Sequence, residues 1–340
     1  MKSRLISKGI IVTIGLAISM LSVGQQPSGN SRASSPVLVS PTAIPKPVIT
    51  PPSPSPTPAM PSTSSGSGFD RFKKSRSFST LSNADINDHE DAGVLNDGGS
   101  VYTGVFAVHS IYPPSQFNLQ LPASATGTQT LFAPTTRPTN GGCIEVGTAY
   151  TTDPGSSTTS VEVYAYDFCM AGGPNWGKRV AVTQQFLDTY AGATAHGQRA
   201  YALAIYTSDN TTTETSTWRA ELYNFNKQQW EEFYTSRATP NAFALFDRRG
   251  WSIFETWYQP GQCSKSLPVL GVEGLAYYQP FTKQWESLTE TMAPQGGSPL
   301  RNHTDLGGSC FVADSHGPAS YHLLPDVPSY NTWKVDSSGH

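Results

Sequence analysis

The sequence has little charge and few residues of the kinds that metal and thiol chemistry require. Only 14% of its 340 residues are charged, the net charge is −3, and there are four cysteines. No CxxC pair, HExxH motif or similar ligand spacing occurs, so we expect no metal ion and no cofactor. A GxSxG turn is also missing, which argues against a serine hydrolase built on a nucleophile elbow.

The chain also lacks a basic patch. Its one basic cluster, within residues 71–76, follows a linker, and we attribute it to a solvated segment or a processing site. Binding to nucleic acid depends on clustered lysine and arginine side chains that neutralise phosphates. We therefore expect no nucleic-acid partner.

The N-terminus has the pattern of an export signal. Three basic residues among the first eight precede an apolar run at residues 9–23, and small residues follow as a cleavage site. The run is shorter than the about 20 residues that a membrane span needs. We predict that residues 1–24 are a signal peptide and that the protein is secreted or held at the cell surface. Contact with a membrane is expected only if this segment is retained as an anchor.

Composition divides the rest of the chain into three parts. Residues 25–68 are rich in Pro, Ser and Thr, which predicts a disordered linker because such a segment buries too little apolar surface to fold. Residues 69–100 end in a stretch rich in Asn, Asp and Gly, and we predict a loop or pro-segment there. The folded domain is then expected at residues 101–340, a size that all-β sandwiches reach as one domain.

The stretch between Cys143 and Cys169 predicts a β-hairpin, because two alternating arms flank a turn at residues 153–157. In the symmetric register Cys143 lies opposite Cys169, so we predict a disulfide between them. Cys263 and Cys310 would then pair by elimination. The same register places Glu145 opposite Asp167.

Two glutamates in predicted strands stand out as candidate site residues. Glu145 shares a strand face with two small residues, Gly147 and Ala149, which leaves room for a molecule to approach the sheet. Glu255 lies between apolar and aromatic neighbours on one face of residues 250–259, although a charged side chain is rarely buried without a partner. A salt bridge from Glu255 to an arginine at 248 or 249 is the alternative interpretation.

The remaining pattern favours an all-β fold. Alternation predicts strands at 101–112, 200–208, 215–234 and 269–281. The stretch 113–140 is expected to be mostly loop with one short strand, and 179–190 to be a strand rather than a helix. In all we expect about ten strands in an antiparallel two-sheet sandwich of the concanavalin-like or jelly-roll kind. The stretches 222–233 and 277–288 share an aromatic, a Lys-Gln pair and a Trp-Glu pair, which predicts hairpins of the same shape.

Three short motifs resemble glutamic peptidases. Ile144-Glu145-Val146-Gly147 looks like the I-E-A-G-W strand of neprosin-type peptidases, whose glutamate is catalytic, although Thr148 stands where that strand has Trp. Tyr164-Ala165-Tyr166-Asp167 before Cys169 is similar to that family's F-x-Y-W-T segment. Trp251-Ser252-Ile253-Phe254-Glu255 resembles the W-I-V-E strand of fungal glutamic peptidases, the eqolisins, in which the glutamate is the second catalytic residue and the position of Glu145 is Gln.

This resemblance implies a secreted endopeptidase that acts at acidic pH on a peptide or protein substrate, with proline-containing sites as the implied preference. Glu145 and Glu255 would form the catalytic dyad, with Glu255 activating water and Glu145 acting in its protonated form. Asp167, Trp251 and Trp257 are the predicted substrate-binding neighbours.

Two other function classes remain open from the residues. A carbohydrate- or cell-wall-binding module would use exposed aromatic side chains, drawn from the tryptophans at 218, 230, 251, 257 and 285. A glycoside hydrolase would also use paired carboxylates, but the E-x-D-x-E run of many sandwich glycosidases is missing.

Overall fold

The structure is a computed structural model in which the chain divides into two compact units, residues 1–45 and 46–340. All described residues belong to the second unit. They are residue 51 and the ranges 88–96, 102–117, 119–121, 123–139, 141–171, 173–193, 198–207, 217–236, 250–258, 267–288, 300–304, 322–323 and 331–336. The predicted signal peptide and nearly all of the predicted linker therefore lie outside the described residues.

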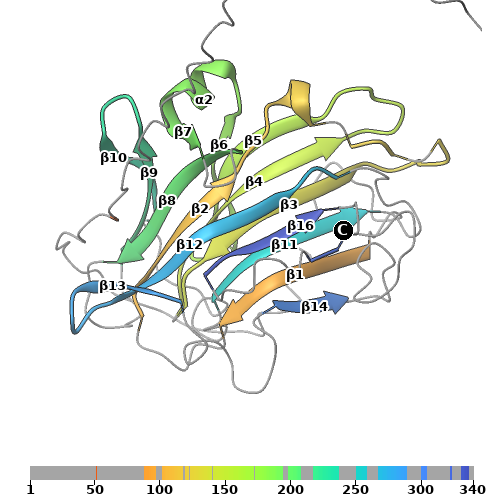
Figure 1. Ribbon diagram of the computed structural model, residues 1–340. Helices are drawn as coiled ribbons and strands as arrows, with labels where there is room; N and C mark the ends of the chain where they lie inside the picture. Colours follow the sequence, from red (N-terminus) through yellow and green to blue (C-terminus); the bar gives the residue numbers. More distant parts are fainter. Residues whose placement is uncertain are drawn as a thin grey trace, which may run out of the picture. The chain divides into compact units, whose positions relative to one another are not determined.

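One antiparallel sheet, here called the first sheet, contains seven strands. They are β14 (Leu300–Thr304), β1 (Asp88–Asn96), β11 (Gly250–Tyr258), β3 (Gln129–Arg137), β4 (Ile144–Thr152), β5 (Ser160–Asp167) and β6 (Asn175–Ala181). They lie side by side in that order, and each neighbouring pair is antiparallel (Figure 1).

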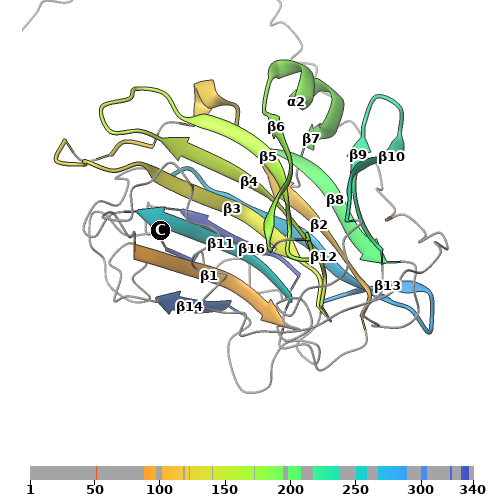
Figure 2. The same ribbon diagram turned by 180° about the vertical axis from the view of Figure 1, so that it is seen from behind.

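The second sheet has nine strands, also antiparallel. Its main path is β10 (Gln229–Thr235), β9 (Trp218–Asn224), β8 (Arg199–Thr207), β2 (Gly104–Ser110), β12 (Leu270–Gln279), β16 (Trp333–Asp336) and β15 (His322–Leu323). Two short strands lie off this path: β7 (Ala191–Ala193) pairs with β8, and β13 (Gln284–Ser287) pairs with β12. Outside the sheets are a 3-10 turn, η1 (Pro114–Gln116), and the helix α2 (Gln184–Tyr190), which is visible in both views (Figure 2).

The two sheets pack face to face around a shared core. Alternation of side chains buries one face of each strand, as in β9, where every second residue is buried. Leu131 and Val146 of the first sheet join Leu203 and Val272 of the second in a single apolar cluster. The expected all-β, antiparallel two-sheet sandwich is therefore confirmed.

A chain of polar side chains crosses this core and is centred on His109. Its Nδ1 lies 3.1 Å from the hydroxyl of Tyr201, and its Nε2 lies 2.8 Å from Thr136 Oγ1. Thr136 donates to Ser252 Oγ at 3.2 Å, and Trp333 Nε1 donates to the same oxygen at 3.1 Å. His109 is fully buried, and burial lowers its pKa from 6.5 to about 3.

Three local expectations are wrong. Asp88–Asn96 forms β1, so the loop expected within residues 69–100 is wrong there, whereas the alternative of a pro-segment stays a prediction. Gln129–Arg137 forms a nine-residue, fully buried strand, longer than the one short strand expected in this loop-like stretch. The expected strand at 179–190 contains α2, because Thr183 caps the helix by accepting a hydrogen bond from the Phe186 N–H at 3.2 Å.

The hairpin of β4 and β5 forms, but its register differs by one residue from the symmetric one. Glu145 lies opposite Tyr166, not Asp167. The Cys143–Cys169 disulfide forms nevertheless, with the two Cα atoms 5.1 Å apart, because the chain turns after β5 and the Phe168 N–H donates to Cys143 O at 2.7 Å. The proposed pair Cys263 and Cys310 lies outside the described residues.

The two stretches with related sequences form hairpins with the same turn. Gln228 and Lys283 occupy matching positions and have φ angles of 55° and 56°, respectively. The tryptophan two residues later, Trp230 or Trp285, packs against Phe106 with ring centres 6.1 and 6.3 Å apart. The prediction of a shared hairpin shape is confirmed.

Candidate functional site

Both predicted glutamates lie on the side of the first sheet that faces away from the shared core. We call this side the glutamate face. It carries a second apolar cluster, separate from the core, to which Trp176 and Trp257 add partly buried rings. The buried members of that cluster are Phe132, Ala149, Tyr164, Tyr166, Phe168, Trp251 and Ile253.

Glu145 has no exposed surface and is held by two hydrogen bonds. The Tyr164 hydroxyl donates to Oε1 at 2.7 Å, and Trp251 Nε1 donates to Oε2 at 2.9 Å. The two donors come from different strands, β5 and β11, so the fold of the sheet fixes the orientation of the carboxylate. Both oxygens act as acceptors, and charge-assisted hydrogen bonds of this kind are among the stronger ones in proteins.

The space that small residues were expected to leave beside Glu145 is filled by Tyr164. A Cβ atom added at Gly147 would lie 2.8 Å from the Tyr164 hydroxyl oxygen and 2.9 Å from Thr135 Cβ. The expectation of open room next to Glu145 is therefore wrong. Gly147 instead permits the phenol to lie across β4 and reach the carboxylate.

Arg137 is a buried member of this site that sequence reasoning missed. Its guanidinium carbon lies 4.5 Å from the centre of the Phe168 ring and 4.8 Å from that of Trp251, and its Nε donates to Gly142 O at 2.8 Å. Cation–π contacts gain strength when the cation is desolvated. Arg137 thus supports the indole ring that donates to Glu145. Arg137 lies in β3 directly opposite Trp251, and predicting this contact requires the correct register between β3 and β11.

Glu255 lies on the same face, farther along the sheet. It is 1% exposed, and Trp257 Nε1 donates to its Oε1 at 3.0 Å. Glu255 lies level with Phe132 on β3 and with Ala149 on β4, and Ala149 is four residues beyond Glu145 in the same strand. The two Cα atoms are thus about 13 Å apart along the strands and about 10 Å apart across them. At this separation of the Cα atoms, the strand register alone does not place both carboxylates within reach of the same water molecule.

Asp167 points to the opposite side of the first sheet, because a one-residue change of register moves a side chain to the other face. It is 1% exposed. The Cys169 N–H donates to its Oδ1 at 2.8 Å, and the Tyr234 hydroxyl donates to its Oδ2 at 3.0 Å. Burial raises the pKa of Asp167, and these two donors act in the opposite direction. The expected grouping of Asp167 with the two glutamates is wrong, whereas Trp251 and Trp257 each contact one of them.

The alternative partner of Glu255, an arginine at 248 or 249, lies outside the described residues. Among the residues that are described, no group of three or more His, Cys, Asp or Glu side chains could hold a metal ion. No helix within these ranges is long and apolar enough to cross a membrane.

Comparison with known proteins gives only distant structural similarity. No family model and no curated protein matches the sequence. A crystal structure of scytalido-glutamic peptidase with a peptide-based transition state analog aligns with 74% of this chain and 99% of its own, at 10% identity and a TM-score of 0.37. SCP-B, a member of the eqolisin family in a complex with the tripeptide Ala-Ile-His, aligns over the same shares at 9% identity and a TM-score of 0.37.

A third solved structure of another kind also aligns. It is the CBM2 module of the evolved Dit of Lactobacillus casei BL23 phage J-1, with 10% identity, 52% of this chain, 58% of its own and a TM-score of 0.21. The first two similarities are to eqolisin peptidases and not to neprosin. The neprosin-type resemblance of residues 144–147 therefore stays a prediction.

Proposed function

We propose that this chain is a glutamic endopeptidase whose active site is the glutamate face. The observation that carries the proposal is the environment of Glu145, a carboxylate with no exposed surface whose two oxygens accept hydrogen bonds from Tyr164 and Trp251. A carboxylate held in this way is a fixed proton acceptor, and a hydrolase needs such a group to activate water. Because Glu145 is covered, water and substrate reach it only when the groups around it move.

In the proposed reaction Glu145 takes a proton from water while the water oxygen bonds to the carbonyl carbon of the peptide. The negative charge that develops on the carbonyl oxygen needs hydrogen-bond donors. The Tyr164 hydroxyl and the Trp251 N–H each carry a single proton that points to Glu145, and in the proposed reaction they turn to the carbonyl oxygen once Glu145 has taken the proton from water. Glu145 then passes its proton to the amine nitrogen, and the carbon–nitrogen bond breaks.

The division of roles that we propose differs from the one that the family resemblance implies. The resemblance makes Glu255 the base and Glu145 the protonated partner. Glu145 is the carboxylate that donors from two other strands hold at both oxygens, and a base must be held in place in this way to take a proton from water. Because the register separates the two carboxylates, we propose that Glu255 acts at a neighbouring part of the same substrate and not on the attacking water.

We further propose that the substrate is a peptide or protein, with cleavage favoured at acidic pH and at proline-containing sites, and that the protein is secreted. The short motifs at 144–147 and 251–255 support the substrate class, and the basic and apolar pattern of residues 1–24 supports secretion. Sequencing the N-terminus of the protein recovered from the medium tests the second point. A protein that stays with the cells and keeps residues 1–24 would contradict it.

A second candidate function, carbohydrate binding, is favoured by the two matching hairpins. Trp230 and Trp285 flank Phe106 in an aromatic cluster that is separate from the core, and both indoles are only partly buried. Aromatic rings of this kind offer large apolar faces next to polar groups. Retention on insoluble polysaccharide that is lost in W230A and W285A would support this function, whereas equal retention of the variants would exclude it.

The experiment that tests the peptidase is incubation of the purified protein with a mixed peptide library and, separately, with polysaccharides, at pH 3 to 7. We expect new peptide termini with the wild type and none with E145Q. The matched control is E162Q, which changes a glutamate on the same face, level with Glu255 but more exposed and already paired with Arg179. Peptide cleavage by E145Q at the wild-type rate would contradict the proposal, and cleavage of polysaccharide alone would favour a glycosidase.

A further inference from the structure

A cavity lies where the end of β5 meets β10, and it is distinct from the glutamate face. Its volume is about 570 Å³. Asp167, whose side chain points away from the glutamate face, forms part of its wall. The lining residues are Asp167, Met170 and Ala171 from one side and Glu232, Phe233, Tyr234 and Thr235 from β10.

The carboxylate of Asp167 is buried in this wall, and among the described residues its hydrogen bonds come from uncharged groups. Its two hydrogen bonds come from the Cys169 backbone N–H and the Tyr234 hydroxyl. Burial raises the pKa of Asp167, which means that its surroundings penalise the charged form. A cation that entered the cavity would remove this penalty.

Two hydroxyl groups next to Asp167 have no hydrogen-bond partner among the described residues. They are Thr235 Oγ1, which is buried in the cavity wall, and Ser236 Oγ, which belongs to a side chain only 1% exposed. Ser236 contributes to lowering the pKa of Asp167, but it does not reach hydrogen-bond geometry with it. Buried hydroxyls are normally paired, and of these two only Thr235 lines the cavity, where it can accept from a polar ligand.

Charges of both signs surround the cavity, with Asp167 and Glu232 in its wall, Arg219 opposite Thr235, and Lys178 over the Phe233 ring. Glu232 at its wall lies directly opposite Glu221 on β9, and like charges at opposed positions repel. Burial raises the pKa of Glu221 and the nearby Glu232 adds to this rise, while the hydrogen bond from Tyr206 and the charge of Arg219 act in the opposite direction.

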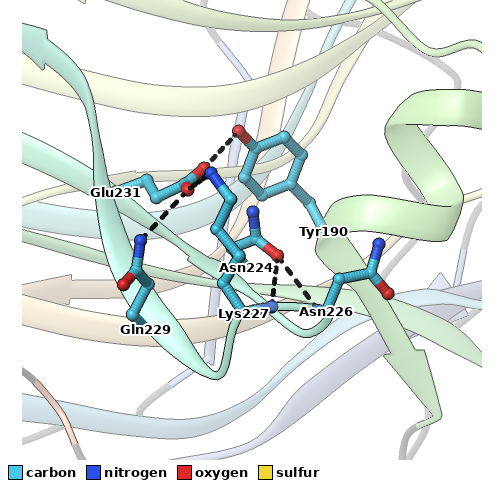
Figure 3. Close-up of polar contacts among 6 residues, drawn as sticks. All are labelled: Tyr190, Asn224, Asn226, Lys227, Gln229 and Glu231. Carbon is cyan, nitrogen blue, oxygen red and sulfur yellow. Dashed lines mark hydrogen bonds and ion pairs between the residues drawn. The ribbon is translucent and has the colours of Figure 1, made fainter.

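The lysine in the turn of this hairpin is already engaged elsewhere. Lys227 Nζ lies 2.8 Å from Glu231 Oε1, and the Tyr190 hydroxyl donates to Glu231 Oε2 at 2.8 Å (Figure 3). Asn224 Oδ1 accepts from the backbone N–H groups of Asn226 and Lys227 and fixes the turn. Glu231 therefore holds this lysine, and the same network anchors the start of β10 to α2.

The aromatic wall is also compatible with a cation. Lys178 Nζ lies 4.9 Å from the centre of the Phe233 ring, so this ring already supports one ammonium group. Met170 and Ala171 supply apolar surface next to the carboxylate.

We propose that this cavity is a binding site for a protonated primary amine carried on a short apolar chain. The ammonium group donates to Asp167 and to the open hydroxyl oxygen of Thr235, while the carbon chain packs against Met170 and Phe233. Glu232 adds long-range attraction. The proposal does not depend on peptidase activity, because the cavity and the glutamate face lie on opposite sides of the first sheet.

The test is calorimetric titration of the full chain at pH 7 with n-butylammonium chloride, with 1-butanol and sodium butyrate as the neutral and anionic controls. We expect n-butylammonium to bind at least about tenfold more tightly than 1-butanol, and D167N to lose about tenfold in affinity for the amine. E232Q should lose less, and the distant control E162Q should bind as the wild type does. Equal affinity for n-butylammonium and 1-butanol, or unchanged affinity of a folded D167N, would overturn the proposal.

A second variant keeps the test valid if D167N fails to fold. Ala171 is exposed at the cavity wall, so A171F adds a ring that narrows the cavity without removing a polar contact. We expect A171F to weaken binding of n-butylammonium. Unchanged binding by A171F would place the amine elsewhere and overturn the assignment.

Discussion

Replacing His109 should change how the stability of the fold depends on pH. His109 is neutral and fully buried, and its pKa is lowered from 6.5 to about 3. Between those values the unfolded chain binds a proton that the folded chain does not, so stability rises with pH. One proton corresponds to about 1.4 kcal/mol per pH unit, and the wild type should therefore lose about 2.5 kcal/mol through His109 between pH 7 and pH 4.5.

The assay is urea unfolding of the wild type and of H109Q at pH 7 and pH 4.5. Glutamine can keep one donor and one acceptor in the core but has no titrating group. We expect H109Q to be less stable at pH 7 but to lose about 2.5 kcal/mol less than the wild type on acidification. The control is T136V, which removes the partner 2.8 Å from Nε2 while leaving the imidazole, and which should keep the pH dependence. The same loss on acidification in H109Q and the wild type would refute the reasoning.

Three further changes have defined outcomes. G147A places a Cβ 2.8 Å from the Tyr164 hydroxyl oxygen, so urea unfolding should show a free energy of unfolding lower by about 1–3 kcal/mol. The double variant G147A/Y164F should lose less stability than G147A and Y164F lose together, and strictly additive losses would contradict this account. W251F removes the N–H that holds Glu145 Oε2, and kcat of the proposed peptidase should fall about 10- to 100-fold in a fluorescent peptide assay, whereas an unchanged kcat would show that the indole does not orient the carboxylate. D167N removes a carboxyl whose pKa is raised by burial in the folded state. This carboxyl stabilises the fold at pH values below its ordinary pKa of 3.8, and the stabilisation is lost as pH rises through the pKa of the folded state. Unfolding experiments between pH 3.5 and pH 6 should therefore show this loss of stability in the wild type and not in D167N, and a loss that persists in D167N would assign the effect to another group.

Much of the fold could be predicted from the sequence, because alternation of apolar and polar residues is a local property. β4 and β5 show this alternation, and the Cys143–Cys169 disulfide closes the base of their hairpin, whereas β8 is an apolar run buried on both faces. The extent of β3 was underestimated because prolines at 134 and 138 and several threonines resemble a loop, although its residues are fully buried in the sheet.

The candidate site depended on register, which the sequence does not encode locally. A shift of one residue between β4 and β5 moves Asp167 to the opposite face and places Tyr166 opposite Glu145. The contacts of Glu145 with Tyr164 and Trp251 arise from three strands that are neighbours only in the folded sheet. Arg137 was missed for the same reason, because its partners Phe168 and Trp251 are distant in sequence.

The central claim is that Glu145 is the base that activates water. The direct measurement is kcat/KM on one cleaved peptide for the wild type, E145Q, E255Q and the control E162Q, with each variant shown to be folded by near-ultraviolet circular dichroism. We predict that E145Q loses about 100- to 10,000-fold, the usual contribution of a general base, that E255Q loses less and mainly through KM, and that E162Q is unchanged. Full activity of E145Q together with an inactive E255Q would contradict this account and return the base to Glu255.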